Sequence, residues 1–386
     1  MDVQTRADDV LRTAGGVPGV VALAADRDRI LYQGAFGRRD LSGDDPMTVD
    51  TVFWIASQSK ALVTAAALQL VELGRVGLDD PVGDVLPELA SPQVLEGFDE
   101  HGDPRLRPAR RPITLRLLLT HTAGFVYDIW NADMLRYQQR KGIPNVIECR
   151  RVTLGTPLAF DPGERWEYGI NIDWAGQMVE RLSGWSLQDY LRVHLLDPLG
   201  MRDTSFTLTP SQRARLVRMH ARGADGSLTP MEFEIPQQPE FFMGGGGLYG
   251  TGPDYIRFLR MILREGELDG VRVLRPETVR EMTVNQIGDL MVGPLTTAIP
   301  GYSHDAEFFP GLPKKWSLGF MVNAEEAPTG RSAGSLAWAG LGNSFYWIDV
   351  RRGIAGIVLT QIVPFGDGES LALLDGFERA ILAEDT

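Results

Sequence analysis

Both ends of this chain have the pattern of β-strands, whereas its middle has the pattern of helices. Near the N-terminus, two β-favouring runs at 20–25 and 30–36 are separated by a polar tetrapeptide, which is typical of a hairpin. Four further strands are predicted near the C-terminus, at 316–323, 335–341, 344–350 and 354–362. One sheet must then be assembled from both termini, with the middle of the chain inserted as a second lobe.

The helices of this arrangement are predicted from apolar residues that recur three and four positions apart. In the middle of the chain they cover 59–73, 114–119, 172–182, 186–195 and 255–263. One further helix is expected at each end of the chain, at 2–14 and 369–384. We therefore predict an α/β protein of the α+β type, in which residues 1–75 and 300–386 form the sheet lobe and residues 76–299 form a mostly helical lobe.

The charge of the chain excludes several classes of partner. The 386 residues include 38 Lys and Arg against 51 Asp and Glu, so the net charge is −13, which repels nucleic acid and anionic lipid alike. The mixed-charge stretch 99–111 is interpreted as a solvated loop. The first residues are polar and acidic and lack the pattern of a signal peptide. We expect a cytoplasmic protein, provided that no signal has been trimmed, that binds neither nucleic acid nor membranes; the sequence does not indicate an oligomeric state.

Disulfides and metal sites are not expected either. Cys149 is the single cysteine, and it has no ligand-spaced partner nearby. The five histidines show no metal-ligand spacing. We therefore expect an activity that needs neither a metal nor a cofactor.

One tetrapeptide has the residue types of a nucleophilic site. Ser57 and Lys60 stand three positions apart at the start of the most apolar helix, so they share a helix face and Lys60 can reach back over Ser57. A lysine desolvated against such a helix can be neutral enough to take the proton of a serine nucleophile. The helix N-terminus supplies free N–H groups for an oxyanion. The alternative interpretation is an N-cap serine beside a solvent-facing lysine.

Three later residues extend this hypothesis. Tyr168 lies on a loop before a helix, where its phenol can lie beside a lysine and act as a general acid and base. Trp338 and Gly340 fall in a predicted strand, in which small residues let an extended substrate approach the backbone. His121, on a loop after a helix, is a further candidate base, although a structural role is the more common one for such a histidine.

In this order the motifs resemble those of the serine β-lactamase and penicillin-binding-protein superfamily. They are most similar to the class C β-lactamase-like branch, which includes the family VIII carboxylesterases. The resemblance covers nearly the whole chain and rests on Ser57-Gln58-Ser59-Lys60, Leu118-Leu119-Thr120-His121-Thr122-Ala123-Gly124, Tyr168-Gly169-Ile170-Asn171, Gly244-Gly245-Gly246-Gly247-Leu248 and Trp338-Ala339-Gly340. It implies the fold of that superfamily, with the active site between the two lobes.

The resemblance also implies roles for individual residues. Ser57 is expected to be the nucleophile, Lys60 its partner in proton transfer and Tyr168 the proton relay. The backbone N–H groups of Ser57 and Leu341 are expected to form the oxyanion hole. Whether Lys60 or Tyr168 takes the proton during acylation is left open. The residues expected to contact the substrate are Trp338, Gly340, Tyr127, Asn171 and Phe242.

Two departures from the β-lactamase pattern favour a neutral ester over a β-lactam. Trp338 stands where β-lactamases carry the lysine of Lys-Thr-Gly, so the cation that pairs with a β-lactam carboxylate is missing. Ile170 stands where they carry the asparagine of Tyr-x-Asn, and an asparagine follows only at Asn171. We expect a serine esterase that hydrolyses small neutral carboxylic esters or passes the acyl group to an alcohol or amine. The alternatives are an amide, β-lactam or D-amino-acid peptide hydrolase on the same fold, or a non-catalytic binding module.

Two further motifs are typical of other enzymes, but their surroundings do not fit. Residues 330–334 match G-x-S-x-G around Ser332, and in α/β-hydrolases this motif needs a strand before it and a helix after it. Here a polar loop precedes it and a strand pattern follows. Residues 245–250 match G-x-G-x-x-G without the βαβ unit of a dinucleotide site. These glycines are therefore interpreted as a tight turn beside the active site.

Overall fold

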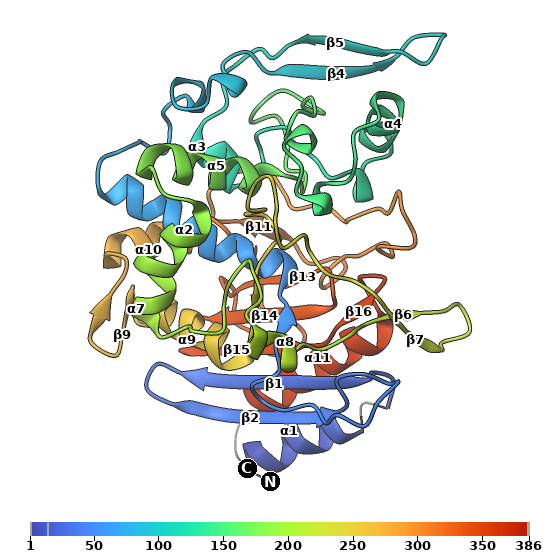
Figure 1. Cartoon of the computed structure of the whole chain (residues 1–386). Helices are drawn as coiled ribbons and strands as arrows, with labels where there is room; N and C mark the ends of the chain where they lie inside the picture. Colours follow the sequence, from blue (N-terminus) through green and yellow to red (C-terminus); the bar gives the residue numbers. More distant parts are fainter. Residues whose placement is uncertain (1, 14, 384–386) are drawn as a thin grey trace.

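A seven-stranded antiparallel sheet forms the base of the molecule, and strands from both ends of the chain build it. The computed structural model, shown in Figure 1, describes residues 2–13 and 15–383. The strand order is β11-β12-β13-β14-β15-β1-β2. The bounds are β1 Gly19–Asp26, β2 Ile30–Gly37, β11 Lys314–Trp316, β12 Met321–Asn323, β13 Leu336–Gly340, β14 Ser344–Asp349 and β15 Ile354–Leu359. β1 pairs with β15, from Val21 opposite Leu359 to Asp26 opposite Ile354, so the predicted joining of the two termini in one sheet is confirmed.

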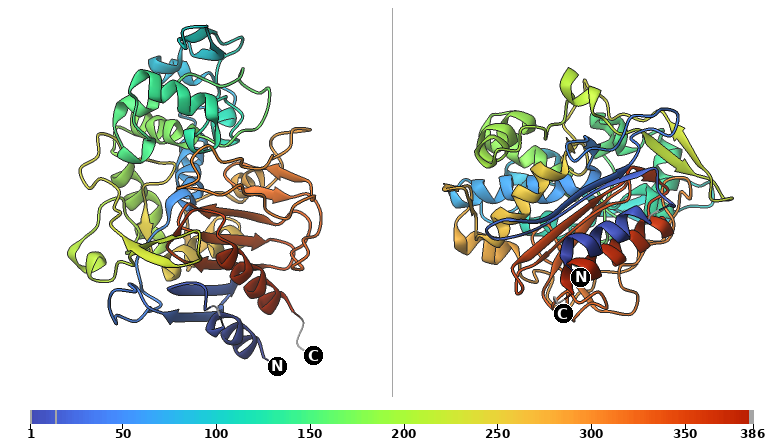
Figure 2. Two further views of the ribbon diagram at one scale, coloured as in Figure 1. Left: turned by 90° about the vertical axis from the view of Figure 1, so that its right-hand side faces the viewer. Right: turned by 90° about the horizontal axis from the view of Figure 1, so that it is seen from below.

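Helices cover both faces of this sheet. α1 (Val3–Arg12) and α11 (Gly368–Leu382) pack side by side on one face, whereas α9 (Gly252–Leu263) packs against β1 and β15 on the other (Figure 2). Every residue of β1 except the last is buried, because a strand between two helical layers is apolar on both sides. The predicted terminal helices are confirmed, apart from the positions at 14 and 384, which lie outside the described residues.

The remaining elements form the upper part of the molecule in Figure 1 and the connections around the sheet. The helices are α2 Ser59–Glu72, α3 Leu115–Leu119, α4 Ala132–Lys141, α5 Asn171–Ser183, α6 Leu187–Leu191, α7 Asp197–Leu199, α8 Pro210–Ala214 and α10 Pro276–Met282. The short strands are β3 Phe53–Trp54, β4 Gln93–Phe98, β5 Pro104–Pro108, β6 Met219–Arg222, β7 Leu228–Met231, β8 Tyr249–Gly250, β9 Glu267–Leu268, β10 Val271–Arg272 and β16 Ile362–Val363. α2 packs against α5 and is buried along most of its length, as a helix that is apolar all round must be.

Two predicted segments differ from the structure. The strand predicted at 316–323 is two strands, β11 and β12, because the chain turns at Gly319, whose φ of +97° suits glycine. The Ser317 N–H donates to the Phe320 carbonyl at 2.8 Å and closes this turn. The stretch 99–111, interpreted as a loop, contains β5, which pairs with β4 and places Leu106 opposite Leu95. Arg107 of β5 donates to Glu96 of β4 and to Asp161 at 2.8 Å each, so the charged side chains of this stretch help to hold the strand.

The division of the chain into two lobes at residues 75 and 300 stays a prediction. The helix α9 belongs to the segment 76–299, yet it covers the sheet. Within the residues that the structure describes, no helix combines the length and the apolar character that crossing a bilayer requires.

Candidate active site

Ser57 lies in a single 3-10 turn, Ala56–Gln58, immediately before α2. The turn begins with Ala56 at a φ of 46°, a left-handed conformation that costs a residue with a side chain roughly 1–3 kcal/mol and is frequent at active sites. Strand β13 passes directly behind the turn. A Cβ added to Gly340 would stand 2.5 Å from the Ile55 carbonyl oxygen, so only glycine lets the strand approach Ser57 this closely.

Two small apolar pockets meet at Ser57. One has a volume of about 30 Å³ and the other about 20 Å³, and Ser57, Trp130 and Leu341 line both of them. The first is completed by Trp54, Ala56, Tyr127, Ile129, Val146, Ile147, Met243, Gly245 and Gly246. The second is completed by Tyr168, Leu295, Trp338, Ala339, Gly340 and Phe365. The predicted oxyanion residues, Ser57 and Leu341, thus stand together at the junction of the two pockets.

Lys60 is buried and its amine contacts three groups. Nζ lies 3.1 Å from Ser57 Oγ, 3.0 Å from the Tyr127 hydroxyl and 2.5 Å from the Gly245 carbonyl oxygen. A carbonyl can only accept a hydrogen bond, whereas the two hydroxyls can donate or accept. A neutral amine, with two N–H groups and one lone pair, can therefore satisfy all three partners: it donates two hydrogen bonds and accepts one from a hydroxyl.

Burial sets the charge state of Lys60 and of a nearby acid. Desolvation lowers the pKa of the Lys60 amine to about 7, and the charge of Asp173 acts against this shift. Desolvation in turn raises the pKa of the Asp173 carboxyl above its usual range, and the charge of Lys60 opposes it. Lys60 can therefore lose its proton near neutral pH, which is the property a general base requires.

Tyr168 reaches Ser57 from the other side. Its hydroxyl is hydrogen-bonded with Ser57 and accepts a hydrogen bond from Trp338 Nε1 at 2.9 Å. Burial raises the pKa of the Tyr168 phenol, so it stays protonated at neutral pH. Lys60 Nζ lies over the face of the Tyr168 ring, 4.6 Å from its centroid. The hydroxyl that meets the lysine is therefore that of Tyr127, which the sequence had suggested only as a substrate contact.

Two of the residues expected to contact the substrate lie elsewhere. Asn171 is buried, donates to the Phe125 carbonyl at 3.0 Å and lies 3.0 Å from His121 Nδ1. Phe242 packs against Phe206, with ring centroids 5.1 Å apart. Neither residue lines a pocket at Ser57. By contrast, the structure brings Trp338, Gly340 and Tyr127 to these pockets.

The competing candidates have other surroundings. His121 is fully buried, and desolvation holds its pKa well below the usual value, so its ring is neutral. Ser332 lies in the loop between β12 and β13, and its N–H donates to Asp349 at 2.7 Å. A strand rather than a helix follows it, so the G-x-S-x-G context fails as predicted. Among the described residues, no group of three or more His, Cys, Asp or Glu side chains could hold a metal.

Sequence reasoning missed two parts of this site. The Gly245 carbonyl contacts Lys60, and Asp173 Oδ1 accepts the Gly245 N–H at 2.9 Å. The run Gly244-Gly245-Gly246-Gly247 indicates close packing of the backbone at this point. Asp173 carries no comparable signal, because an Asp in the first turn of a helix usually indicates only a favourable interaction with the helix dipole.

The comparisons with known proteins identify the family of the chain. The Beta-lactamase family model matches residues 6–377. Monacolin J acid methylbutanoyltransferase of Aspergillus terreus is 33% identical, over 95% of this chain and 92% of its own. Lovastatin esterase of Penicillium rubens is 32% identical, over 93% of this chain and 92% of its own.

The fold has a close counterpart among solved structures. A mutant of simvastatin synthase from Aspergillus terreus superposes with a TM-score of 0.85 at 33% identity, covering 99% of this chain and 97% of that one. Sequence and fold thus agree over nearly the whole chain, and the chain belongs to the β-lactamase family as a serine hydrolase or acyltransferase related to the family VIII esterases.

Proposed function

We propose that this protein forms an acyl-enzyme on Ser57 from small neutral carboxylic esters and passes the acyl group to water or to an alcohol. The observation that carries the proposal is the contact of Lys60 Nζ with Ser57 Oγ at 3.1 Å, in surroundings that lower the pKa of the amine to about 7. A serine becomes a strong nucleophile when a group of this kind removes its proton.

Acylation follows from the two hydrogen-bond partners of Ser57. Neutral Lys60 takes the proton while Oγ bonds to the ester carbonyl carbon, and the carbonyl oxygen becomes an oxyanion held by the N–H groups of Ser57 and Leu341. The C–O bond to the alcohol then breaks. Tyr168, whose phenol is protonated, donates its proton to the leaving alkoxide, and the Lys60 ammonium, which lies over the Tyr168 ring, stabilises the phenolate until the next nucleophile gives it a proton. In this scheme Lys60 is the acylation base, because burial favours the neutral form of both groups.

Deacylation reverses these roles. Water or a second alcohol enters the place of the departed alcohol and loses its proton to the same relay, as microscopic reversibility requires. Its oxygen attacks the acyl carbon, and Ser57 Oγ leaves with a proton. Whether water or an alcohol dominates depends on which one the pocket holds.

The lining of the site supports a neutral, compact substrate. None of the described residues that line the two pockets is charged, and burying a carboxylate without a cation is costly. Trp130 lines both pockets, so its ring would contact whatever is bound at Ser57. The names of the relatives describe methylbutanoyl transfer and hydrolysis of an ester, lovastatin, which supports a short, branched acyl group.

The test is replacement of the nucleophile. Ser57→Ala should abolish ester turnover while the thermal unfolding temperature stays close to that of the wild type, because a small side chain is lost without a large cavity. A fluorophosphonate probe should modify the peptide that contains Ser57, and mass spectrometry reads this out. Ser332→Ala is the matched control, and it should retain kcat/KM within a few-fold and remain labelled at Ser57.

Two outcomes would contradict the proposal. Full activity in Ser57→Ala together with loss of activity in Ser332→Ala would identify Ser332, and not Ser57, as the nucleophile. A wild-type protein that reacts with neither esters nor the probe would instead be a binding module on this fold.

A further inference from the structure

We propose that Asp173 is a positioning residue that holds Lys60 through the backbone of Gly245 and supplies the counter-charge of its ammonium form. The inference rests on the proposed function, because it concerns the base that activates Ser57.

The backbone of one residue, Gly245, connects the acid to the amine. Asp173, in the first turn of α5, is fully buried, and its Oδ1 accepts the Gly245 N–H at 2.9 Å. The carbonyl of the same residue, Gly245, accepts from Lys60 Nζ at 2.5 Å. These two groups lie in successive peptide units on either side of the Gly245 Cα, so Asp173 anchors the backbone of the residue whose carbonyl holds the amine.

The packing around Gly245 leaves no freedom at this connection. A Cβ added to Gly245 would stand 2.5 Å from Asp173 Oδ2 and 2.9 Å from the Tyr127 hydroxyl. The carboxylate and the hydroxyl therefore both press against the Gly245 backbone, and the position of Lys60 is fixed from two sides.

A purely structural role does not account for a carboxylate here. Oδ2 has no hydrogen-bond partner among the described residues, and a buried charge that is only half satisfied is expensive. An asparagine would accept the same Gly245 N–H without that cost. The charge of Asp173 is compensated by Lys60, whose ammonium form it stabilises in turn.

The other titratable groups around the pair do not change charge near neutral pH. Burial raises the pKa of the phenols of Tyr127 and Tyr168 and of the Cys149 thiol, the last to about 12, and the charge of Asp173 adds to each shift. His121, next to Lys60, is held neutral by burial. Asp173 and Lys60 are therefore the two groups of this cluster that titrate close to neutrality.

The test separates the charge of Asp173 from its hydrogen bond. Asp173→Asn keeps an oxygen for the Gly245 N–H but removes the negative charge, so Lys60 loses its proton at a lower pH. The acidic limb of the kcat/KM profile, which rises as Lys60 becomes neutral, should move to lower pH by about one unit or more. The rate of Ser57 labelling by a fluorophosphonate should show the same movement, and this readout needs no knowledge of the natural ester.

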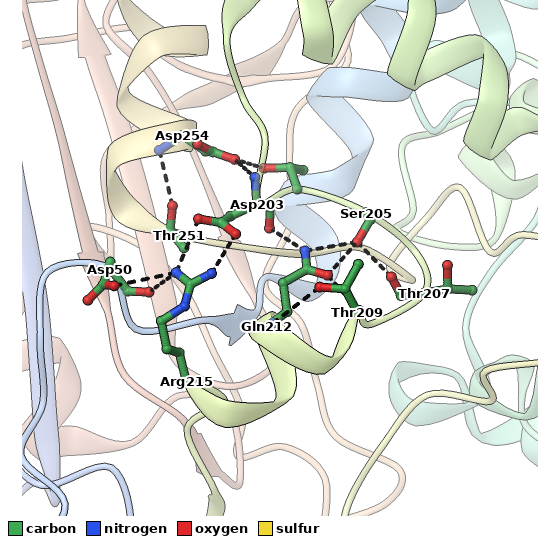
Figure 3. A network of polar contacts seen from close by, with 10 residues as sticks. Asp50, Asp203, Ser205, Thr207, Thr209, Gln212, Arg215, Thr251 and Asp254 are labelled. Carbon is green, nitrogen blue, oxygen red and sulfur yellow. Dashed lines mark hydrogen bonds and ion pairs between the residues drawn. The ribbon is translucent and has the colours of Figure 1, made fainter.

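Asp254→Asn is the matched control. Asp254 is also a buried carboxyl with a raised pKa of about 6, and its Oδ2 accepts from the Asp203 N–H and the Thr204 hydroxyl at 2.8 Å each. Figure 3 shows that these contacts belong to a network that contains neither Ser57 nor Lys60. Its substitution should leave the midpoint of the profile at the wild-type pH, although stability falls.

The outcomes are distinguishable. A profile in Asp173→Asn that coincides with the wild-type profile overturns the inference while the proposed function stands. A wild-type protein that is not labelled at Ser57 overturns the proposed function, and the inference with it. Asp173→Ser, which also removes the charge and keeps an acceptor oxygen, is measured in parallel so that the result does not depend on the folding of one variant.

Discussion

At the scale of single residues, the site depends on how protons are shared around Ser57 Oγ. Lys60 and Tyr168 both contact this serine, but burial acts on them in opposite directions, lowering the pKa of the amine and raising that of the phenol. Lys60 is thereby suited to take a proton and Tyr168 to give one, and such pairs of groups with opposite pKa shifts are frequent in acid–base catalysis. Trp338 supports it, because its indole N–H occupies a lone pair of the Tyr168 oxygen.

Removal of either group should slow turnover strongly. We expect Lys60→Ala and Tyr168→Phe each to lower kcat by about 10² to 10⁴, the usual effect of losing an acid–base group. The double variant should be far less impaired than the product of the two factors, because the groups act in one step. Steady-state kinetics of the four proteins measures this, with Tyr137→Phe, a buried tyrosine on α4 away from Ser57, as the control. Factors that multiply would indicate independent roles.

The pH profile should distinguish the two variants. Lys60 is active only when neutral, so the rate rises with pH through its pKa of about 7. Tyr168→Phe should keep this acidic limb at a lower overall rate, whereas Lys60→Ala should lose it. An acidic limb that disappears in Tyr168→Phe instead would make the phenol the acylation base.

At the scale of elements, the site is built where four segments distant in sequence come together without room for side chains. The Ser57 turn, strand β13, helix α5 and the glycine segment 244–247 meet backbone to backbone. A Cβ on Gly340 would contact the Ile55 carbonyl at 2.5 Å, and one on Gly245 would contact Asp173 at the same distance. These glycines fix the distance between the nucleophile and the groups that activate it.

Gly245→Ala tests this point. The added methyl group must displace Asp173 or Tyr127, and with them Lys60, and a shift of about 1 Å in such a site costs on the order of 10² in kcat. Gly293→Ala is the control, because nothing lies within 4 Å of its added Cβ. It should leave kcat and thermal stability unchanged. A Gly245→Ala enzyme with wild-type kcat would show that this segment tolerates movement.

The elements that the sequence predicted well are those whose signal is local. β1 and β15 are continuous apolar runs, and α2 is apolar on all sides, so their burial is evident before the structure is known. The single strand predicted at 316–323 is wrong, because the turn at Gly319 divides this apolar run into two strands. Likewise, motif spacing identifies Ser57, Lys60 and Tyr168, whereas the contacts of Tyr127 and Asp173 exist only after distant segments pack together.

At the scale of the whole molecule, the fold is that of β-lactamases, while the pockets at Ser57 lack the charges that a β-lactam needs. Trp338, which the resemblance places where β-lactamases carry a lysine, donates its only N–H to Tyr168 and packs its ring on Trp316, with the ring centroids 4.6 Å apart. Trp338 therefore gives the second pocket a wall that carries no positive charge. The chain thus belongs to a family of serine hydrolases and acyltransferases, and among its described residues those that line the two pockets at Ser57 are uncharged.

This combination predicts the selectivity of the enzyme. We expect kcat/KM for short-chain activated esters to exceed that for penicillins and cephalosporins by at least about a hundredfold, which corresponds to roughly 2.7 kcal/mol of transition-state free energy. Burying the β-lactam carboxylate without a cation accounts for a penalty of that size, and an ester also has a better leaving group than an amide. Steady-state kinetics on both substrate classes with one preparation measures the ratio. An activated ester that carries a carboxylate separates the effect of the negative charge from that of the leaving group, and it should be turned over much more slowly than its neutral counterpart. Equal rates for these two esters would mean that Trp338 does not exclude anions. Cephalosporin turnover as fast as ester turnover would mean the same.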